Sequence, residues 1–90
     1  MRAIVTVIGK DRVGIIAQVT ALLAAQSVNV LDISQTVMDE YFTMIMMVDT
    51  AACPLAFTDL AELLATEGRS NWGMDIRIQR EDIFNAMHRI

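Results

Sequence analysis

Residues 7–35, VIGKDRVGIIAQVTALLAAQSVNVLDISQ, decide the fold, because they hold a strand, a charged loop, a helix and a second strand in succession. Residues 2–8 are β-branched and apolar on both faces, which is typical of a central strand. Residues 14–26 place their apolar side chains at helical spacing. Residues 29–38 alternate between apolar and polar side chains, which predicts a half-exposed strand. The chain therefore begins with a strand–helix–strand unit.

The first predicted helix carries two apolar stripes rather than one. Ile16, Val19 and Leu23 form the first stripe, and Ile15 and Leu22 belong to a second. We therefore expect this helix to bury two faces, one in the core and one against a partner.

The next segments continue the alternation of strands and helices. Residues 38–41 predict a tight turn, and residues 41–49 return as a strand that is apolar on both faces. Pro54 is placed to open a second helix, which carries an apolar stripe from Phe57 to Leu64. A second helix therefore follows the third strand, and it ends between residues 68 and 73.

The end of the chain completes the pattern. Residues 74–80 alternate cleanly and predict an edge strand, and residues 81–90 predict a short terminal helix with one apolar stripe. The order βαββαβ predicts an α+β, ferredoxin-like sandwich in a single domain over residues 1–90. Helices can cover only one face of such a sheet, so the terminal helix or a second subunit must cover the other.

Composition narrows the functional classes. The chain has 90 residues, a formal net charge of −4 and 54% hydrophobic residues, which argues against a disordered tail and against nucleic-acid binding. Residues 13–31 contain no charge, but Gln18 and Asn29 interrupt them, so we do not expect a membrane span. This uncharged stretch predicts a homo-oligomer, most simply a dimer. The lone Cys53 fits a reduced, cytoplasmic protein without a disulfide framework.

Catalytic patterns are weak. Gly9 and Gly14 have the spacing of a P-loop but lack the Lys-Ser/Thr that would contact phosphate and magnesium. Arg12 and Asn29 invite comparison with acylphosphatases, which share the topology, yet the loop lacks the pattern of those enzymes. His88 is far from the single cysteine in the sequence, and no ligand cluster has zinc spacing. We therefore predict no enzyme, no metal and no cofactor.

The loop at residues 9–14 has two interpretations. A helix N-terminus favours an anion such as a carboxylate, and Gly14, expected in the first turn of the helix, would let a small ligand approach closely. Asp11 is predicted as the N-cap, or as the acceptor of an ammonium group. A capped helix with a solvated turn explains the same residues equally well.

The whole chain resembles an ACT domain, and in particular the small stand-alone ACT proteins related to the ACT halves of the glycine cleavage system repressor. Gly9, Asp11, Gly14 and Asn29 fall on the positions of that pattern, whereas Glu40 stands where those proteins usually have glycine. The resemblance implies a regulatory domain that binds an amino acid or another small metabolite, pairs as a homodimer and modulates a partner enzyme or regulator.

The same resemblance implies a binding site where the first loop of one copy meets the second strand of the next. The residues implicated are Asp11, Arg12, Val13, Gly14, Ile15 and Asn29. A dimerisation or adaptor module without a metabolite is the alternative, and an acylphosphatase-like hydrolase is a more distant one.

Overall fold

A computed structural model describes residues 1–10 and 13–82 of the chain, which form one four-stranded antiparallel sheet and two helices. The elements follow in the order β1(Arg2–Lys10), α1(Ile15–Ala25), β2(Asn29–Met38), β3(Tyr41–Asp49), α2(Phe57–Glu67), η1(Gly68–Trp72) and β4(Asp75–Arg80). The strands lie side by side in the order β2-β3-β1-β4. This is the predicted ferredoxin-like βαββαβ fold. Backbone at Glu81 and Asp82 is helical, and the rest of the predicted terminal helix lies outside the described residues.

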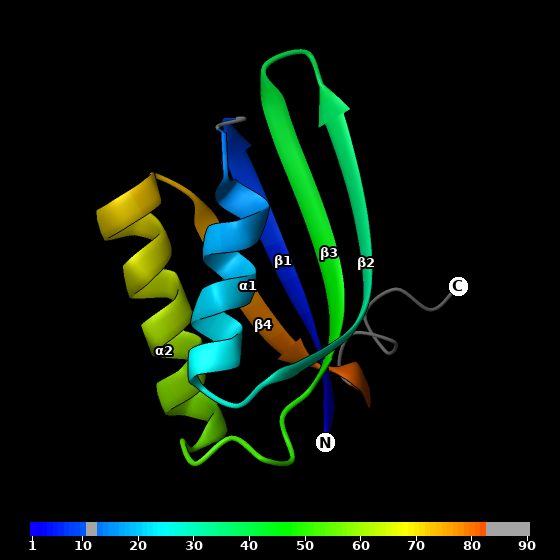
Figure 1. Cartoon of the computed structure of the whole chain (residues 1–90), viewed down its shortest axis with the longest axis vertical. Helices are drawn as coiled ribbons and strands as arrows, with labels where there is room; N and C mark the ends of the chain where they lie inside the picture. Colours follow the sequence, from blue (N-terminus) through cyan, green and yellow to red (C-terminus); the bar gives the residue numbers. More distant parts are fainter. Residues whose placement is uncertain (11–12, 83–90) are drawn as a thin grey trace.

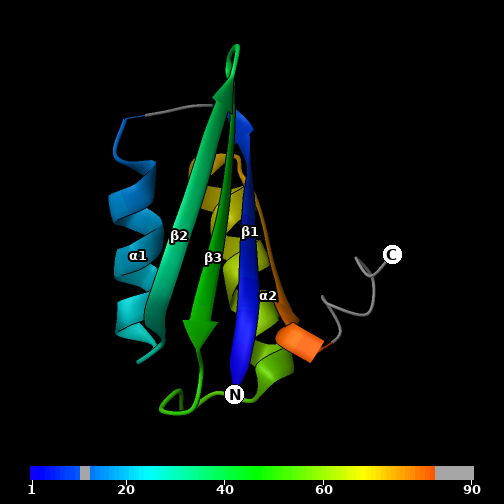
Figure 2. The same ribbon diagram turned by 90° about the vertical axis from the view of Figure 1, so that its right-hand side faces the viewer.

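Both helices cover the same face of the sheet, as Figures 1 and 2 show from two directions. The central strands are β1 and β3, as their apolar sequences predict, and β4 is one edge strand. The other edge strand is β2, which pairs only with β3 among the described strands. In Figure 1 the β2–β3 hairpin extends beyond the ends of both helices, so its tip has no helix over it.

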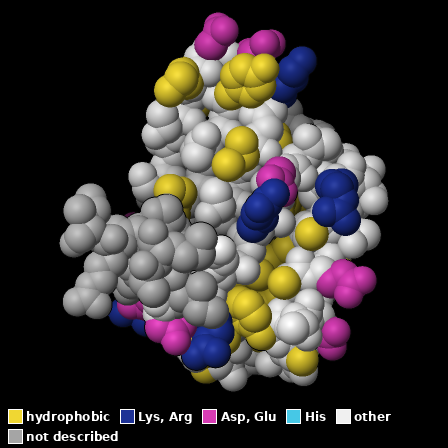
Figure 3. All heavy atoms as spheres, turned by 180° about the vertical axis from the view of Figure 1, so that it is seen from behind, with side chains coloured by type: hydrophobic (Ala, Val, Ile, Leu, Met, Phe, Trp, Pro, Cys, Tyr) yellow, Lys and Arg dark blue, Asp and Glu magenta, His cyan; other side chains and the backbone are white. Residues whose placement is uncertain are grey.

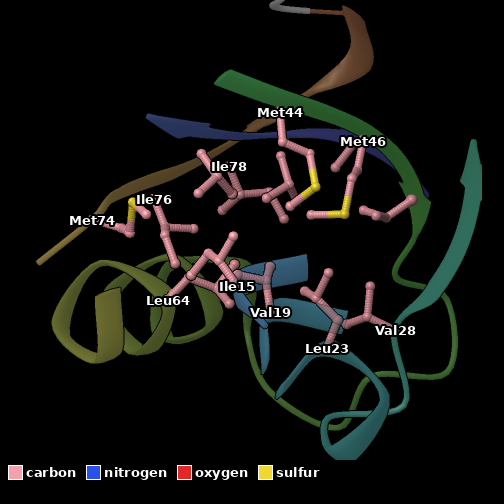
Figure 4. Close-up of a cluster of buried hydrophobic side chains, with 14 of the residues drawn as sticks. Ile15, Val19, Leu23, Val28, Met44, Met46, Leu64, Met74, Ile76 and Ile78 are labelled. Carbon is pink, nitrogen blue, oxygen red and sulfur yellow. The ribbon is translucent and has the colours of Figure 1, made fainter. Parts of the chain in front are cut away.

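The core lies between the sheet and the helices. The side chains of Met44 and Met46 on β3 point toward α1 (Figure 4). The α1 side chains that face them are those of Ile15, Val19 and Leu23. These five side chains are no more than 2% exposed to solvent. Methionine is unbranched and fills irregular gaps, so it suits a layer where a helix crosses a twisted sheet.

The orientation of α1 differs from the prediction in one respect. Ile15 was expected in a second stripe facing a partner, but it lies in the core in line with Val19 and Leu23, at spacing i, i+4, i+8. Ile16 and Leu22 are partly buried and pack against the edge of the same core. The helix therefore buries one broad face within its own chain, because apolar residues at nearly every position left its rotation undetermined by sequence.

Helix α2 confirms its predicted stripe but not its predicted start. Leu60 and Leu64 are buried, and Phe57 packs partly against the core. Ala56 is the N-cap residue, so Pro54 lies in the connector and not in the first turn. The helix passes directly into η1, a single wider turn of π-helix that ends at Trp72 and has Gly73 as its C-cap.

A close backbone approach holds the η1 corner against β4. The amide of Met74 donates a hydrogen bond of 2.9 Å to the carbonyl oxygen of Gly68. A Cβ added to Gly68 would lie 2.7 Å from the Met74 carbonyl oxygen and 2.8 Å from Cγ1 of Ile76. Because the first of these neighbours is backbone, it cannot rotate away, and the corner requires glycine.

We predict that Gly68→Ala lowers the free energy of unfolding by about 1–3 kcal/mol, since the added methyl forces the backbone of β4 away from η1. Ser70→Ala, at an exposed position of the same turn, serves as the control and should change stability by less than about 0.5 kcal/mol. Urea denaturation of the two variants and the parent chain measures both values. Equal stability of the Gly68→Ala variant and the parent would contradict the close packing of this corner.

Candidate functional site

The candidate loop lies where β1 ends and α1 begins. Lys10 is the last residue of β1, and Ile15 is the first of α1. Two of the predicted site residues, Asp11 and Arg12, lie outside the described residues. Val13 and Gly14 follow, and Val13 is 99% exposed. The described part of the loop is therefore open to solvent in a single copy of the chain.

Gly14, and not Asp11, is the N-cap of α1. Its backbone is left-handed, with φ 83° and ψ 5°, and its carbonyl oxygen accepts the first helical hydrogen bond from Gln18 at 3.0 Å. The expectation that Asp11 caps the helix is thus wrong, as is the placement of Gly14 in the first turn. The cause is the positive φ, which an L side chain adopts only with strain and glycine adopts freely.

The first turn of α1 is chemically suited to an anion. The N-cap residue, Gly14, has no side chain with which to cap the helix, and the first turn contains no acidic residue. The first amides of a helix lack intrahelical acceptors, and the helix dipole adds partial positive charge at this end. Ile15 offers only its backbone here, because its side chain is 2% exposed and belongs to the core.

Asn29, the remaining predicted site residue, lies at the opposite end of the molecule. Lys10 pairs with Tyr41, which pairs with Met38, so the loop is level with the end of β2. Asn29 begins β2 and pairs with Asp49. The strand has 10 residues, and at about 3.3 Å per residue its ends lie roughly 30 Å apart. One chain therefore does not bring Asn29 to the loop.

This separation also bears on the hydrolase hypothesis. Lys10, where the loop begins, and Asn29 of the same chain lie at opposite ends of the sheet, too far apart for groups beside each of them to orient one water molecule on one substrate. Cys53 is half-buried beside the core, and His88 lies outside the described residues. Within residues 1–10 and 13–82, no three His, Cys, Asp or Glu side chains gather as a metal ion would require.

Strand β2 has an unusual surface for an edge. Every residue of β2 is exposed except Val30, which is partly exposed. Large apolar side chains are prominent, with Leu31 49% exposed, Ile33 40% and Val37 54%. A long exposed apolar edge is a template for pairing with another strand. The alternation in the sequence predicts a half-exposed strand, whereas in the structure nine of the ten residues of β2 are exposed.

The face of the sheet opposite the helices is mixed in character. Figure 3 looks onto this face and shows apolar side chains interspersed with basic and acidic ones over its described part. Its exposed apolar residues include Ile8 at 46% and Ile45 at 41%. None of the helices among the described residues has the length and apolar character needed to cross a membrane.

Comparison with known proteins gives a consistent result. A family model described as the ACT domain matches residues 2–79. A UPF0237 protein of Clostridium acetobutylicum is 51% identical over 90 residues, which span 100% of both chains. The solved structure of an ACT domain protein from Streptococcus pneumoniae is 43% identical, covers 98% of each chain and superposes with a TM-score of 0.83.

A more distant neighbour agrees in fold. The crystal structure of a putative glycine cleavage system transcriptional repressor has a TM-score of 0.71 at 20% identity. The match covers 87% of this chain and 44% of that one. At this identity the likeness concerns the fold alone.

We predict that Gly14→Ala lowers stability by about 1–2 kcal/mol, although no atom lies within 4 Å of the added methyl. The loss comes from the positive φ and not from a clash. Gly14→Asn is the matched variant, because asparagine tolerates left-handed backbone and caps helices well. Thermal melting should therefore rank the parent first, Gly14→Asn second and Gly14→Ala last. A Gly14→Ala variant as stable as the parent would contradict the left-handed cap.

Proposed function

Because the chain belongs to the ACT domain family, we propose that it is a regulatory module that binds a small metabolite, with an amino acid as the expected ligand. It works as a homodimer that modulates a partner enzyme or regulator, and it has no catalytic activity of its own. The observation that carries this proposal is the exposed apolar edge of β2, together with the distance between the two halves of the predicted site.

Antiparallel pairing of the β2 strands of two copies would bring Asn29 of one copy close to the loop of the other. Two copies related by a twofold axis perpendicular to the sheet would place the start of one β2 beside the end of the other. Asn29 of the second copy would then be level with Met38 and Lys10 of the first. The pairing would also cover part of the apolar surface of Ile33 and Val37, which is otherwise exposed. The topology of one chain thus supports a site that is divided between two.

The loop and the incoming strand supply complementary chemistry for an amino acid. The first turn of α1, whose N-cap is a glycine, offers backbone N–H groups to a carboxylate. The Asn29 side chain of the second copy offers both a donor and an acceptor. Gly14 has no atom within 4 Å of its open side, so a ligand atom can approach the backbone there.

An adaptor without a metabolite is the second candidate. The tip of the β2–β3 hairpin favours it, because Met38 is 73% exposed and Tyr41 is 52% exposed. These side chains lie at the end of the hairpin that projects past the helices (Figure 1), where a protein partner could bind them. Aromatic and methionine side chains are enriched in such contacts.

We predict that the chain elutes at twice its 10.0 kDa mass in light-scattering chromatography and that Ile33→Lys shifts it to a monomer. The new charge would be buried at the strand pair, whereas in a single copy it stays solvated. Ile8→Lys is the control, since Ile8 is similarly exposed at 46% but lies on the open face of a central strand. A dimer that Ile8→Lys dissociates and Ile33→Lys leaves intact would contradict pairing through β2.

The divided site has its own test. Thermal-shift screening against the twenty amino acids identifies a ligand, since binding to the folded state alone raises the melting temperature. Gly14→Val and Asn29→Ala should each weaken binding at least about tenfold, which is 1.4 kcal/mol. Mixing the two variants after unfolding should restore binding, because a mixed dimer contains one site with both parental residues.

Each outcome of the mixing experiment is informative. Restored binding supports a site shared between two chains. Two variants that each lose binding and are not rescued on mixing would place the loop and Asn29 in unrelated roles. No ligand in the screen, with the dimer intact, favours the adaptor.

A further inference from the structure

A depression in the surface lies at the corner between η1 and β4, away from the β2 edge. It has a volume of about 440 Å³ and is lined by Arg69, Gly73, Met74, Asp75 and Arg77. This volume lies within the range of sites that hold small metabolites. The corner is on the opposite edge of the sheet from the proposed dimer contact, since the strand order is β2-β3-β1-β4.

Two guanidinium groups border this depression with unused donors. Arg77 uses only Nε, which donates to both carboxylate oxygens of Asp75 at 3.2 and 3.3 Å. Its two terminal nitrogens have no acceptor among the described residues, and neither has the guanidinium of Arg69. Asp75 therefore holds one edge of the Arg77 guanidinium and leaves the other edge available. Arginine presents its donors in a planar fork that matches oxyanions.

A third cation, Lys10, lies on the neighbouring strand, outside the lining of the depression. Asp75 pairs with Ile8 on β1, and Lys10 follows two residues later on the same face of the strand. The lining of the depression itself combines two cations, Arg69 and Arg77, with a single carboxylate, Asp75. This local excess of positive charge occurs in a chain whose net charge is −4. Figure 3 shows dark-blue basic side chains spaced across the described part of this side of the molecule.

A hydrogen bond holds the backbone of the corner, and one side of that backbone, at Gly73, is open. The hydrogen bond from the Met74 amide to the Gly68 carbonyl oxygen closes η1, and the Met74 side chain is 1% exposed. Gly73 between them has φ 64° and no atom within 4 Å of the position of a Cβ. A ligand would therefore contact a closely packed surface at Met74 and could approach the backbone at Gly73 without obstruction.

From this arrangement we propose that the η1–β4 corner binds a small metabolite that carries a phosphate group or a pair of carboxylates. A ligand with several anionic oxygens reaches more than one of the separate cations, whereas a single carboxylate reaches only one. The site is independent of the proposed amino-acid site, because all of its lining residues come from one chain and none comes from β2.

The test is a titration of the ¹⁵N-labelled full chain with inorganic phosphate and, separately, with succinate, at low ionic strength. We expect saturable shifts of the Gly73 and Asp75 amide signals with at least one probe. Arg69→Gln and Arg77→Gln should each weaken binding by about tenfold, since each loses a charge-assisted contact. Arg80→Gln is the matched control, because Arg80 lies on the same strand at its far end and is paired with Asp82 at 2.9 Å.

Saturation by phosphate alone, by succinate alone or by both supports the site and identifies which oxyanion it prefers. Equal weakening by Arg80→Gln and Arg77→Gln would overturn it, since the effect would then be one of net charge. The absence of saturable shifts with either probe would also overturn it. Asn29→Ala should leave the phosphate titration unchanged, which separates this site from the proposed dimer site.

Discussion

The buried layer between the sheet and its two helices is the constraint on which the rest of the structure depends. Side chains from β1, β3 and β4 meet those of α1 and α2 in one continuous apolar cluster. Two helices of 11 residues are enough to cover the central strands on one face, but they leave the β2–β3 hairpin projecting and the opposite face open. The exposed edge and the loop at the start of α1 both follow from that incomplete cover.

Sequence predicted the elements well, because their apolar periodicities differ. The two strands that are apolar on both faces are central, and the strand with clean alternation is an edge. It predicted the rotation of α1 poorly, since Ile15, Ile16, Leu22 and Leu23 are all apolar and only packing against β3 selects among them. It also missed η1, because a wider helical turn depends on the backbone contact between Gly68 and Met74, and no local residue pattern specifies that contact.

Only part of the candidate site could be predicted from the sequence. The spacing of residues predicted a glycine near the start of α1. Whether Gly14 lies in the first turn or is the N-cap depends on its φ angle, which is 83°. The relation between Asn29 and the loop depended on strand direction, since residues 15 apart in sequence lie at opposite ends of a sheet once α1 reverses the chain. The basic corner combines residues from η1, β4 and the turn between them, so it depends on how η1 folds back against β4.

Met74 connects the η1–β4 corner with the end of β1. Its side chain lines the floor of the η1–β4 corner, and a Cβ on Gly9 would overlap its sulfur, so the thioether lies directly against the backbone where β1 enters the loop. A displacement of the Met74 side chain would therefore change the packing both at the η1–β4 corner and at Gly9. If occupancy of the corner changes the affinity of the loop for its ligand, the loop must change the affinity of the corner by the same factor, because such coupling is reciprocal. This one buried methionine is thus the physical contact through which the two proposed sites can influence each other.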